Sequence, residues 1–435
     1  MNLKEILQNL NIKELNPMQQ KMMDVATNNE DIMLLSPTGS GKTLGFLVHA
    51  LQKIKSQNKG VQLLIIVPSR ELGLQIEDVL KQMRTGWKTS FVYGGHDKKV
   101  EINSLAQAPE ILIGTPGRLV FHLQNKNFDL NTVHTLVLDE FDKILEFGFE
   151  EQVSQLIASL SQLQKRILTS ATSMDVLPKF IGNKPPKILN FLNENQSQPK
   201  IEFRKILCAP EEKVETLFKL ICKVGNQRTL VFCNHREAVD RISKLLEEHR
   251  IYHETFHGGM EQDERERALL KFRNESVRIL ITTDLAARGL DIPEVASIIH
   301  YQLPPKEDAF VHRNGRTARM NAEGTAYLMM TEDENYPFLE KRITETSLEE
   351  NYPLPVPTEF ETLYISAGKK DKVNKVDIVG FLLKKGELDK NDVGRIEVKD
   401  YTSYAAIKRS KIKNALNKLS KEKLKGKKVK MEVAY

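Results

Sequence analysis

The run Ser36-Pro37-Thr38-Gly39-Ser40-Gly41-Lys42-Thr43 has the residue types and spacing of a loop that binds phosphate. It follows a short apolar segment, residues 32–35, and leads into a helix-like segment, residues 44–51. Gly39 and Gly41 allow successive backbone N–H groups to converge on one anion, and the positive end of the new helix dipole points at the same place. The pattern predicts a nucleotide-phosphate cradle; an ordinary glycine-containing turn is the alternative.

Four side chains would supply the chemistry. Lys42 is expected to reach the β- and γ-phosphates as a mobile charge, and the Thr43 hydroxyl to bind Mg²⁺. Asp139 and Glu140 directly follow a strand candidate, residues 135–138. Asp139 would hold Mg²⁺ through a water molecule, and Glu140 would orient and deprotonate the attacking water. The alternative for this acidic pair is a helix N-terminus, which favours carboxylates.

The elements around these residues alternate between apolar runs and helical patterns. Strand candidates are residues 63–67, 111–113, 135–138 and 165–169, and helical patterns include residues 71–83 and 151–163. This rhythm predicts a parallel sheet with helices on both faces. Ligands in such sheets bind beyond the carboxyl ends of the strands. Several polar motifs fall at these ends, namely residues 68–71, 94–95, 115–118, 139–142 and 170–172.

Residues 1–30 are predicted to form two amphipathic helices, with Pro17 where the second one starts. Gln19 would lie in the first turn of that helix. Its amide could present a donor and an acceptor to an adenine edge. A glutamine with no role beyond the surface is the alternative.

A polar stretch, residues 193–199, is predicted to be a linker, after which the alternation restarts. The strand candidates there are residues 205–208, 229–233, 278–282, 297–300 and 325–329, with no second phosphate loop among them. Arg316 and Arg319 are three positions apart and would share one face if their segment is helical. Two guanidinium groups suit a γ-phosphate, as arginine fingers do; pairing with a local carboxylate is the alternative.

The last part of the chain follows a proline-containing spacer, residues 343–358, and has the order β-α-β-β-α-β. This order fits the ferredoxin-like plan of an RNA-recognition motif. Tyr364 and Tyr404 stand at base-stacking positions, but Ala406 stands where a second ring is usual in its strand. The platform should therefore be weakened, with more of the binding left to the lysines or to another face. A sheet whose tyrosines simply pack the surface is the alternative.

Composition and charge narrow the class of protein. The chain has 435 residues, of which 40% are hydrophobic and 28% charged, which describes two or three globular domains without a membrane span. The N-terminal residues do not have the pattern of a signal peptide, and three cysteines without a CxxC pair suggest thiols in a reducing cytosol. Residues 359–435 hold 20 Lys and Arg against 11 Asp and Glu, although the net charge of the chain is only +6. This asymmetry points to a polyanion, most often nucleic acid.

These motifs, in this order from about Leu15 to about Glu332, resemble the DEAD-box RNA helicases. The resemblance implies two RecA-like parallel-sheet domains, residues 1–195 and 200–345, followed by an RRM-like α+β domain, residues 359–435. It also implies that ATP binds between the RecA-like domains and is hydrolysed to ADP and phosphate, with Mg²⁺. The implied nucleotide ligands are Gln19, Thr38, Gly39, Ser40, Gly41, Lys42, Thr43 and Asp291; the implied catalytic residues are Lys42, Asp139, Glu140, Arg316 and Arg319.

The same resemblance assigns further roles. Residues that couple hydrolysis to strand separation would be Asp142, Ser170, Thr172 and His312. The RNA path would be lined by Arg70, Gly95, Thr115, Arg118, Gly258, Gln262, Arg265 and Thr283. Three features depart from the family pattern: Phe141 and Ser36 each replace an alanine, and the aromatic residue expected some seventeen positions before Gln19 is missing. We expect activity to survive the first two changes and nucleotide affinity or selectivity to suffer from the third.

The run from Thr362 to Val373 resembles the appended domain of the bacterial DbpA/YxiN group. That resemblance implies an RNA helicase that remodels large-subunit ribosomal RNA near the peptidyl-transferase hairpin during ribosome assembly. The implied protein is a cytoplasmic monomer with ribosomal assembly intermediates as partners and no membrane contact. The alternatives are a general RNA chaperone helicase, a non-catalytic RNA-binding or annealing protein, and a DNA helicase of the same superfamily.

Overall fold

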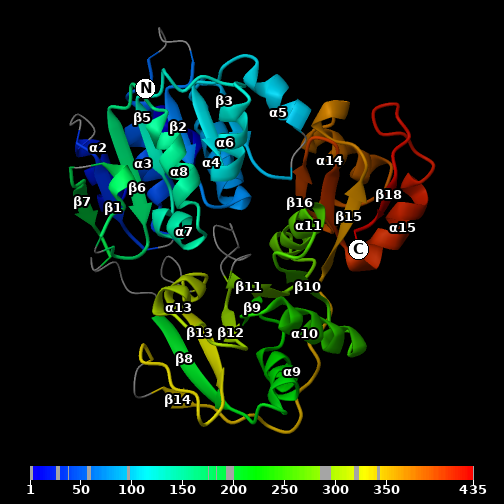
Figure 1. Cartoon of the computed structure of the whole chain (residues 1–435). Coiled ribbons are helices and arrows are strands. Elements are labelled where there is room, and N and C mark those ends of the chain that lie inside the picture. Colours follow the sequence, from blue (N-terminus) through cyan, green and yellow to red (C-terminus); the bar gives the residue numbers. More distant parts are fainter. Residues whose placement is uncertain are drawn as a thin grey trace. The chain divides into compact units, whose positions relative to one another are not determined.

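The computed structural model describes residues 3–25, 30–37, 39–55, 60–95, 98–174, 176–182, 184–192, 200–284, 295–317, 323–339 and 343–434. The chain divides into two compact units: one carries the first β-sheet, and the other carries the second and third sheets (Figure 1). Within the described ranges, no helix combines the length and the apolar character that crossing a bilayer requires.

The first sheet has seven parallel strands in the order β3-β4-β2-β5-β6-β1-β7. Helices cover both of its faces (Figure 1). The strands are β1 (Ile32–Leu35), β2 (Leu63–Ile66), β3 (Thr89–Val92), β4 (Ile111–Gly114), β5 (Thr135–Leu138), β6 (Lys165–Ser170) and β7 (Lys187–Asn190). The helices are α1 (Leu3–Asn9), α2 (Pro17–Asp24), α3 (Lys42–Leu51), α4 (Arg70–Met83), α5 (Lys98–Leu105), α6 (Pro116–Gln124), α7 (Phe141–Glu146) and α8 (Glu150–Ala158).

Successive strand residues in this sheet enter two different cores. Ile65 belongs to the cluster formed with α3 and α4, whereas Leu64 and Ile66 belong to the cluster formed with α6, α7 and α8. Side chains alternate across a strand, so a strand buried on both faces needs a continuous apolar run. This is why the central strands were recognisable from sequence.

The second sheet repeats this plan with seven parallel strands in the order β10-β11-β9-β12-β13-β8-β14. Its strands are β8 (Lys200–Leu207), β9 (Thr229–Cys233), β10 (His253–Phe256), β11 (Ile279–Thr283), β12 (Ser297–His300), β13 (Glu323–Met330) and β14 (Thr344–Glu345). The helices described with it are α9 (Lys213–Val224), α10 (Arg236–Glu248), α11 (Gln262–Arg273) and α13 (Glu307–Asn314).

The third sheet is antiparallel, in the order β16-β17-β15-β18. Its elements are β15 (Phe360–Ile365), α14 (Lys375–Lys384), β16 (Val393–Val398), β17 (Ser403–Lys408), α15 (Arg409–Leu419) and β18 (Met431–Val433). One face packs on α14 and α15 through a core that includes Leu363, Ile365, Ala405 and Ile407. The predicted fold class, two RecA-like parallel sheets and a small ferredoxin-like domain, is confirmed.

Sequence patterns did not reveal β3, β7, β10 and β14. These four are the edge strands of the two parallel sheets, and the burial of β3, β7 and β10 is interrupted by partly or fully exposed residues. The predicted start of the second helix is confirmed: Pro17 is its first residue, and Asn16 and Gln19 form a capping box. The domain limits that the sequence suggested stay predictions.

Phe141, which stands where the DEAD-box pattern has alanine, lies fully buried in the second of the two cores, with its ring centroid 6.5 Å from that of Phe180. We predict that Phe141→Ala leaves a cavity and lowers the free energy of unfolding of the first unit by about 3–5 kcal/mol. Urea unfolding followed by Trp87 fluorescence measures this, because Trp87 is the single tryptophan and packs on that unit. Ile102→Ala, at a side chain 40% exposed, is the control; equal urea midpoints for both variants would contradict the prediction.

Candidate active site

Three neighbouring strands bring the predicted chemistry to one edge of the first sheet. Parallel pairing places β6 between β5 and β1, with Leu138 beside Leu168 and Leu35 beside Ser170. The phosphate loop begins after β1 and the acidic pair after β5, so both lie at the carboxyl end of the sheet. The Ser36 N–H donates to the Ser170 carbonyl at 3.1 Å and ties the loop to the end of β6.

The loop has the backbone that its glycines allow. Gly39 and Gly41 have φ of 80° and 85°, in the left-handed region that glycine enters without strain, and Gly41 caps α3. Lys42 Nζ donates to the carbonyls of Ser36 at 2.5 Å and Pro37 at 3.1 Å, which keeps the ammonium at the loop. Ser36 Oγ also donates to Ser40 Oγ at 2.8 Å. Thr38, predicted to bind nucleotide, lies outside the described residues.

Gln19 is buried beside the loop. Its Nε2 donates to the Gly41 carbonyl at 3.1 Å, and its Oε1 accepts from the Asn16 N–H at 3.0 Å. A Cβ atom on Gly41 would lie 2.5 Å from Gln19 Nε2, so only glycine permits this approach. In the structure Gln19 therefore anchors the loop, and adenine selection by this amide stays a prediction.

Asp139 is the buried carboxylate of the site, only 3% exposed. Burial raises the pKa of this carboxyl, while the hydrogen bond from Thr169 and the positive charge of Lys42 oppose the rise. Thr169 Oγ1 and the Glu140 N–H, the latter at 3.1 Å, both donate to Oδ1. Oδ2 keeps its capacity to accept, so the donor set fits a water-mediated Mg²⁺ site together with the Thr43 hydroxyl in the first turn of α3.

Glu140 has a left-handed backbone, with φ 49° and ψ 53°, at the N-cap of α7. Its N–H also approaches Thr169 Oγ1 at 3.1 Å, which helps to hold this conformation. A non-glycine residue in this region carries strain, a feature that concentrates at functional sites. The geometry is consistent with a base whose direction is fixed by the turn.

Asp142, Ser170 and Thr172, predicted to act in coupling, form one connected group. Thr172 Oγ1 donates to Asp142 Oδ2 at 3.4 Å, and Ser170 Oγ donates to the Thr172 carbonyl at 2.7 Å. A shift at the end of β6 would therefore be felt at α7. Whether this group couples hydrolysis to RNA stays a prediction.

In the second unit, His312 lies buried in α13 and Arg316 lies buried just beyond it. We expected Arg316 and Arg319 to share one face if their segment is helical. This condition is not met at Arg316, because α13 ends at Asn314. Arg319 and Asp291 lie outside the described residues. The buried neighbour of His312, Arg313, escaped sequence analysis.

Arg313 organises this region. Its guanidinium donates to both oxygens of Asp284 at 2.5 and 2.7 Å, to Asn234 Oδ1 at 2.8 Å and to the Gln302 carbonyl at 2.6 Å. The sequence feature that could have indicated this network is the position of Asp284 directly after the buried strand β11. This network positions the segment that carries His312 and Arg316.

The residues predicted to line the RNA path in the first unit lie around α4 and α6. Arg70 begins α4 and stacks 4.2 Å from the Tyr93 ring centroid, Gly95 has φ 83°, and Thr115 caps α6. Arg118 Nε donates to Glu101 Oε2 at 2.5 Å, and the same oxygen lies 2.6 Å from His122 Nε2. Glu101, a buried carboxylate that sequence analysis missed, thus orients Arg118.

In the second unit the predicted RNA residues gather where β10 and β11 end. Gly258 lies in the turn after β10, Gln262 begins α11, and Thr283 ends β11 beside β10. Arg265 lies over the Phe256 ring and donates to Gln262 Oε1 at 3.3 Å. The structure brings these residues together; their contact with RNA stays a prediction.

Tyr364 and Tyr404 face each other on the third sheet, with ring centroids 5.6 Å apart. Tyr404 is only 9% exposed, because it packs with Leu270 of α11 and Ala434. Tyr404 is therefore largely covered and Tyr364 partly buried, an arrangement that favours the alternative in which the tyrosines pack the surface. Base stacking by either ring stays a prediction.

The hydrogen bond from Thr169 to Asp139 gives a pH prediction. Thr169→Val removes a donor that favours the ionised carboxylate, so the pKa of Asp139 should rise further. If ionised Asp139 holds Mg²⁺ as predicted, Mg²⁺-dependent ATP binding should then be lost at a higher pH than in the wild type as the solution is acidified. A titration of a fluorescent ATP analogue at several pH values measures this. Thr169→Ser keeps the donor and should follow the wild type. If Thr169→Val and Thr169→Ser lose ATP binding at the same pH, the hydrogen bond from Thr169 does not set the pKa of Asp139.

Comparison with known proteins agrees with the fold and identifies the family. A model described as DEAD/DEAH box helicase matches residues 16–179, one described as helicase conserved C-terminal domain matches residues 212–321, and one described as DbpA RNA binding domain matches residues 362–433. The solved structure of Mss116p bound to ssRNA and AMP-PNP has a TM-score of 0.67 at 26% identity, covering 76% of this chain and 73% of that one.

Sequence relatives carry matching descriptions. The putative DEAD-box ATP-dependent RNA helicase 29 of Arabidopsis thaliana is 34% identical over 80% of this chain, which spans only 42% of that protein. The ATP-dependent RNA helicase DbpA of Escherichia coli is 29% identical over 97% of this chain and 94% of its own length. The ATP-dependent RNA helicase CshA of Listeria monocytogenes is 31% identical, with 80% of this chain and 68% of that protein covered. With the loop, the acidic pair and the two parallel sheets in place, the chain belongs to the DEAD-box family of ATP-dependent RNA helicases.

Proposed function

We propose that this protein is an RNA-dependent ATPase that locally separates short RNA duplexes. The observation that carries the proposal is the arrangement at the carboxyl edge of the first sheet. There the phosphate loop follows β1, the buried Asp139 and the strained Glu140 follow β5, and β6 pairs with both strands between them. A cradle for phosphate beside a positioned carboxylate base is what phosphoryl transfer to water requires.

Each residue has a role in this proposal. The backbone N–H groups of the loop and Lys42 hold the ATP phosphates, and Glu140 takes the proton of the attacking water. Asp139 and Thr43 would hold Mg²⁺, which when bound neutralises charge on the β- and γ-phosphates. Arg316 and Arg319 are the proposed donors to the γ-phosphate. The connected group Asp142, Thr172 and Ser170 is proposed to report the state of this site to bound RNA.

Glu140→Gln tests the assigned base. The change removes the proton acceptor and keeps the shape, so steady-state ATP turnover should fall about a hundredfold to ten-thousandfold, while ATP-dependent RNA binding persists. Colorimetric phosphate release and RNA anisotropy measure the two properties. Glu151→Gln, at an exposed position in α8, is the matched control and should behave as wild type. Wild-type turnover by Glu140→Gln would remove the assignment.

The proposed RNA target is large-subunit ribosomal RNA near the peptidyl-transferase hairpin. The protein is proposed to act in the cytoplasm as a monomer, with ribosomal assembly intermediates as partners. Support comes from the DbpA RNA binding domain match over residues 362–433, and from the basic balance of residues 359–435. The relative that covers nearly the whole chain is itself a DbpA protein. The alternative is a general RNA chaperone helicase without this target.

Steady-state ATPase activity of the full chain tests the proposed RNA target. We expect stimulation by a large-subunit rRNA fragment that carries the peptidyl-transferase hairpin to exceed that by an unrelated structured RNA of equal length. Equal stimulation by both RNAs would support the proposed helicase activity and contradict the proposed ribosomal RNA target. No stimulation by any RNA would favour the non-catalytic RNA-binding protein, and DNA of equal sequence tests the DNA-helicase alternative.

A further inference from the structure

A buried carboxylate on α5 joins two segments of the RNA path that the sequence predicted for the first unit. Glu101 is only 2% exposed. Its Oε1 accepts from the Tyr93 N–H at 3.0 Å, and its Oε2 accepts from Arg118 Nε at 2.5 Å and lies 2.6 Å from His122 Nε2. One side chain therefore connects the end of β3 with the first two turns of α6.

His122 donates to this carboxylate because of its other neighbour. Asn127 Nδ2 lies 2.9 Å from His122 Nδ1. An amide nitrogen can only donate, so Nδ1 accepts and the neutral ring carries its proton on Nε2, the nitrogen that faces Glu101. The His122 side chain is fully buried. Arg118 and His122 are one turn apart on α6, so Glu101 fixes the direction in which this helix begins.

The side chain of Arg118 is committed to this link. It is only 9% exposed, and its guanidinium carbon lies 5.1 Å from the centroid of the Phe121 ring. A guanidinium group that contacts a carboxylate and a ring has little surface left for a phosphate. The structure therefore favours Arg118 as a residue that holds the turn at residues 115–118, and a direct contact of its side chain with RNA stays a prediction.

Exposed glycine backbone lies at both ends of the link. Gly94 and Gly95 directly follow Tyr93, Gly117 lies in the first turn of α6, and all three glycines are exposed. A Cβ atom on Gly94 or Gly117 would meet no heavy atom of the described residues within 4 Å, its chain neighbours aside. Phosphates can approach the backbone N–H groups of such segments closely, and phosphate contacts position a strand without reading its sequence.

We propose that Glu101 is a positioning residue for RNA binding by the first unit. Its carboxylate holds the segment of Gly94 and Gly95 and the start of α6 in one fixed arrangement, so that a single RNA strand meets both segments already ordered. Preorganisation of this kind strengthens binding, because the free-energy cost of ordering the two segments is met on folding and not on binding. The proposal rests on the proposed function, since it concerns the RNA that the helicase binds.

Charge alone predicts the opposite effect of Glu101. A carboxylate repels the phosphates of RNA, so a variant without this charge should bind RNA more tightly if Glu101 has no part beyond its charge. Positioning predicts weaker binding when the same charge is removed. The sign of the change in Kd for RNA therefore distinguishes the two explanations.

Glu101→Gln in the full chain is the test. The amide keeps the size of the side chain but has one acceptor oxygen, so it cannot serve both Tyr93 and the donors of α6. We expect Kd for a fluorescein-labelled single-stranded RNA, measured by anisotropy with a non-hydrolysable ATP analogue, to rise about tenfold. The RNA concentration that half-stimulates ATP turnover should rise by the same factor, whereas turnover at saturating RNA and the affinity for ATP should stay at wild-type values.

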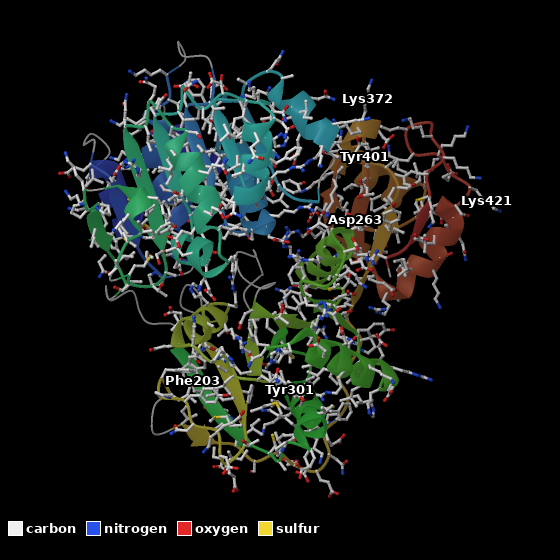
Figure 2. The ribbon with its side chains drawn as sticks, in the orientation of Figure 1. Phe203, Asp263, Tyr301, Lys372, Tyr401 and Lys421 are labelled. Carbon is white, nitrogen blue, oxygen red and sulfur yellow. The ribbon has the colours of Figure 1, made fainter. Side chains whose placement is uncertain are left out.

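Asp263→Asn is the matched control. Asp263, labelled in Figure 2, is an exposed carboxylate in the first turn of α11, next to Gln262 of the predicted RNA path. Removing its charge should leave Kd for RNA unchanged or lower it. Arg118→Lys tests the link from its other end, because lysine keeps the positive charge and lacks the Nε–H that Glu101 accepts. Kd for RNA should rise severalfold in this variant.

An unchanged or lower Kd for Glu101→Gln overturns the positioning role, and so does a wild-type Kd for Arg118→Lys. Trp87 fluorescence shows whether each variant is folded, and Arg118→Lys carries the test if Glu101→Gln does not fold. The two proposals fail separately. If the wild-type protein neither binds RNA nor gains ATP turnover from it, the proposed function fails. If the wild-type protein responds to RNA and Glu101→Gln responds alike, only the positioning role of Glu101 fails.

Discussion

The parallel register of β5, β6 and β1 is the constraint on which the candidate active site depends. Three chain segments, residues 32–35, 135–138 and 165–170, end at one edge only because Leu138 pairs with Leu168 and Leu35 pairs with Ser170. A shift of one residue in the pairing of β5 with β6 would turn the end of β5 over and send Asp139 to the opposite face. The apolar run of each strand, buried on both faces, makes such a shift costly because it would expose core side chains. Thus packing far from the chemistry fixes where the carboxylate stands.

Burial at that edge has a second consequence. Burial removes Asp139 from water and so penalises its charged form. The Thr169 hydroxyl, the Glu140 N–H and the nearby Lys42 stabilise the charge and oppose this penalty. This buried carboxylate fits the proposed Mg²⁺ site, because a bound cation would offset the remaining cost of keeping its charge away from water. Thr169, Glu140 and Lys42 therefore stabilise the charge of Asp139 and also keep the carboxylate ionised for the proposed Mg²⁺.

Sequence reasoning recovered what local patterns encode and missed what long-range packing decides. The glycines of the phosphate loop, the apolar runs of the central strands and the start of the helix at Pro17 could be predicted, because each depends on residues within one segment. Glu101 and Arg313 could not, since a buried ion pair is recognisable only when its distant partner is known. Tyr404 was correctly placed on its strand, but the helix that covers it lies more than a hundred residues earlier in the chain.

Helix α11 joins two parts of the RNA-binding apparatus. Its first turn carries Gln262 and Arg265, and Gln262 Nε2 donates to Glu266 Oε1 at 3.4 Å. Glu266 is also the partner of Lys399, and Leu270, one turn further, packs on Tyr404 of the C-terminal domain. A helix is stiff over this length, and the polar contacts at Thr362 hold the domain to it. An RNA strand held by the C-terminal domain therefore has a fixed relation to the residues predicted to line the path on the second sheet. Because the third sheet turns the face that carries Tyr364 and Tyr404 toward α11, Tyr404 is largely covered and Tyr364 partly so.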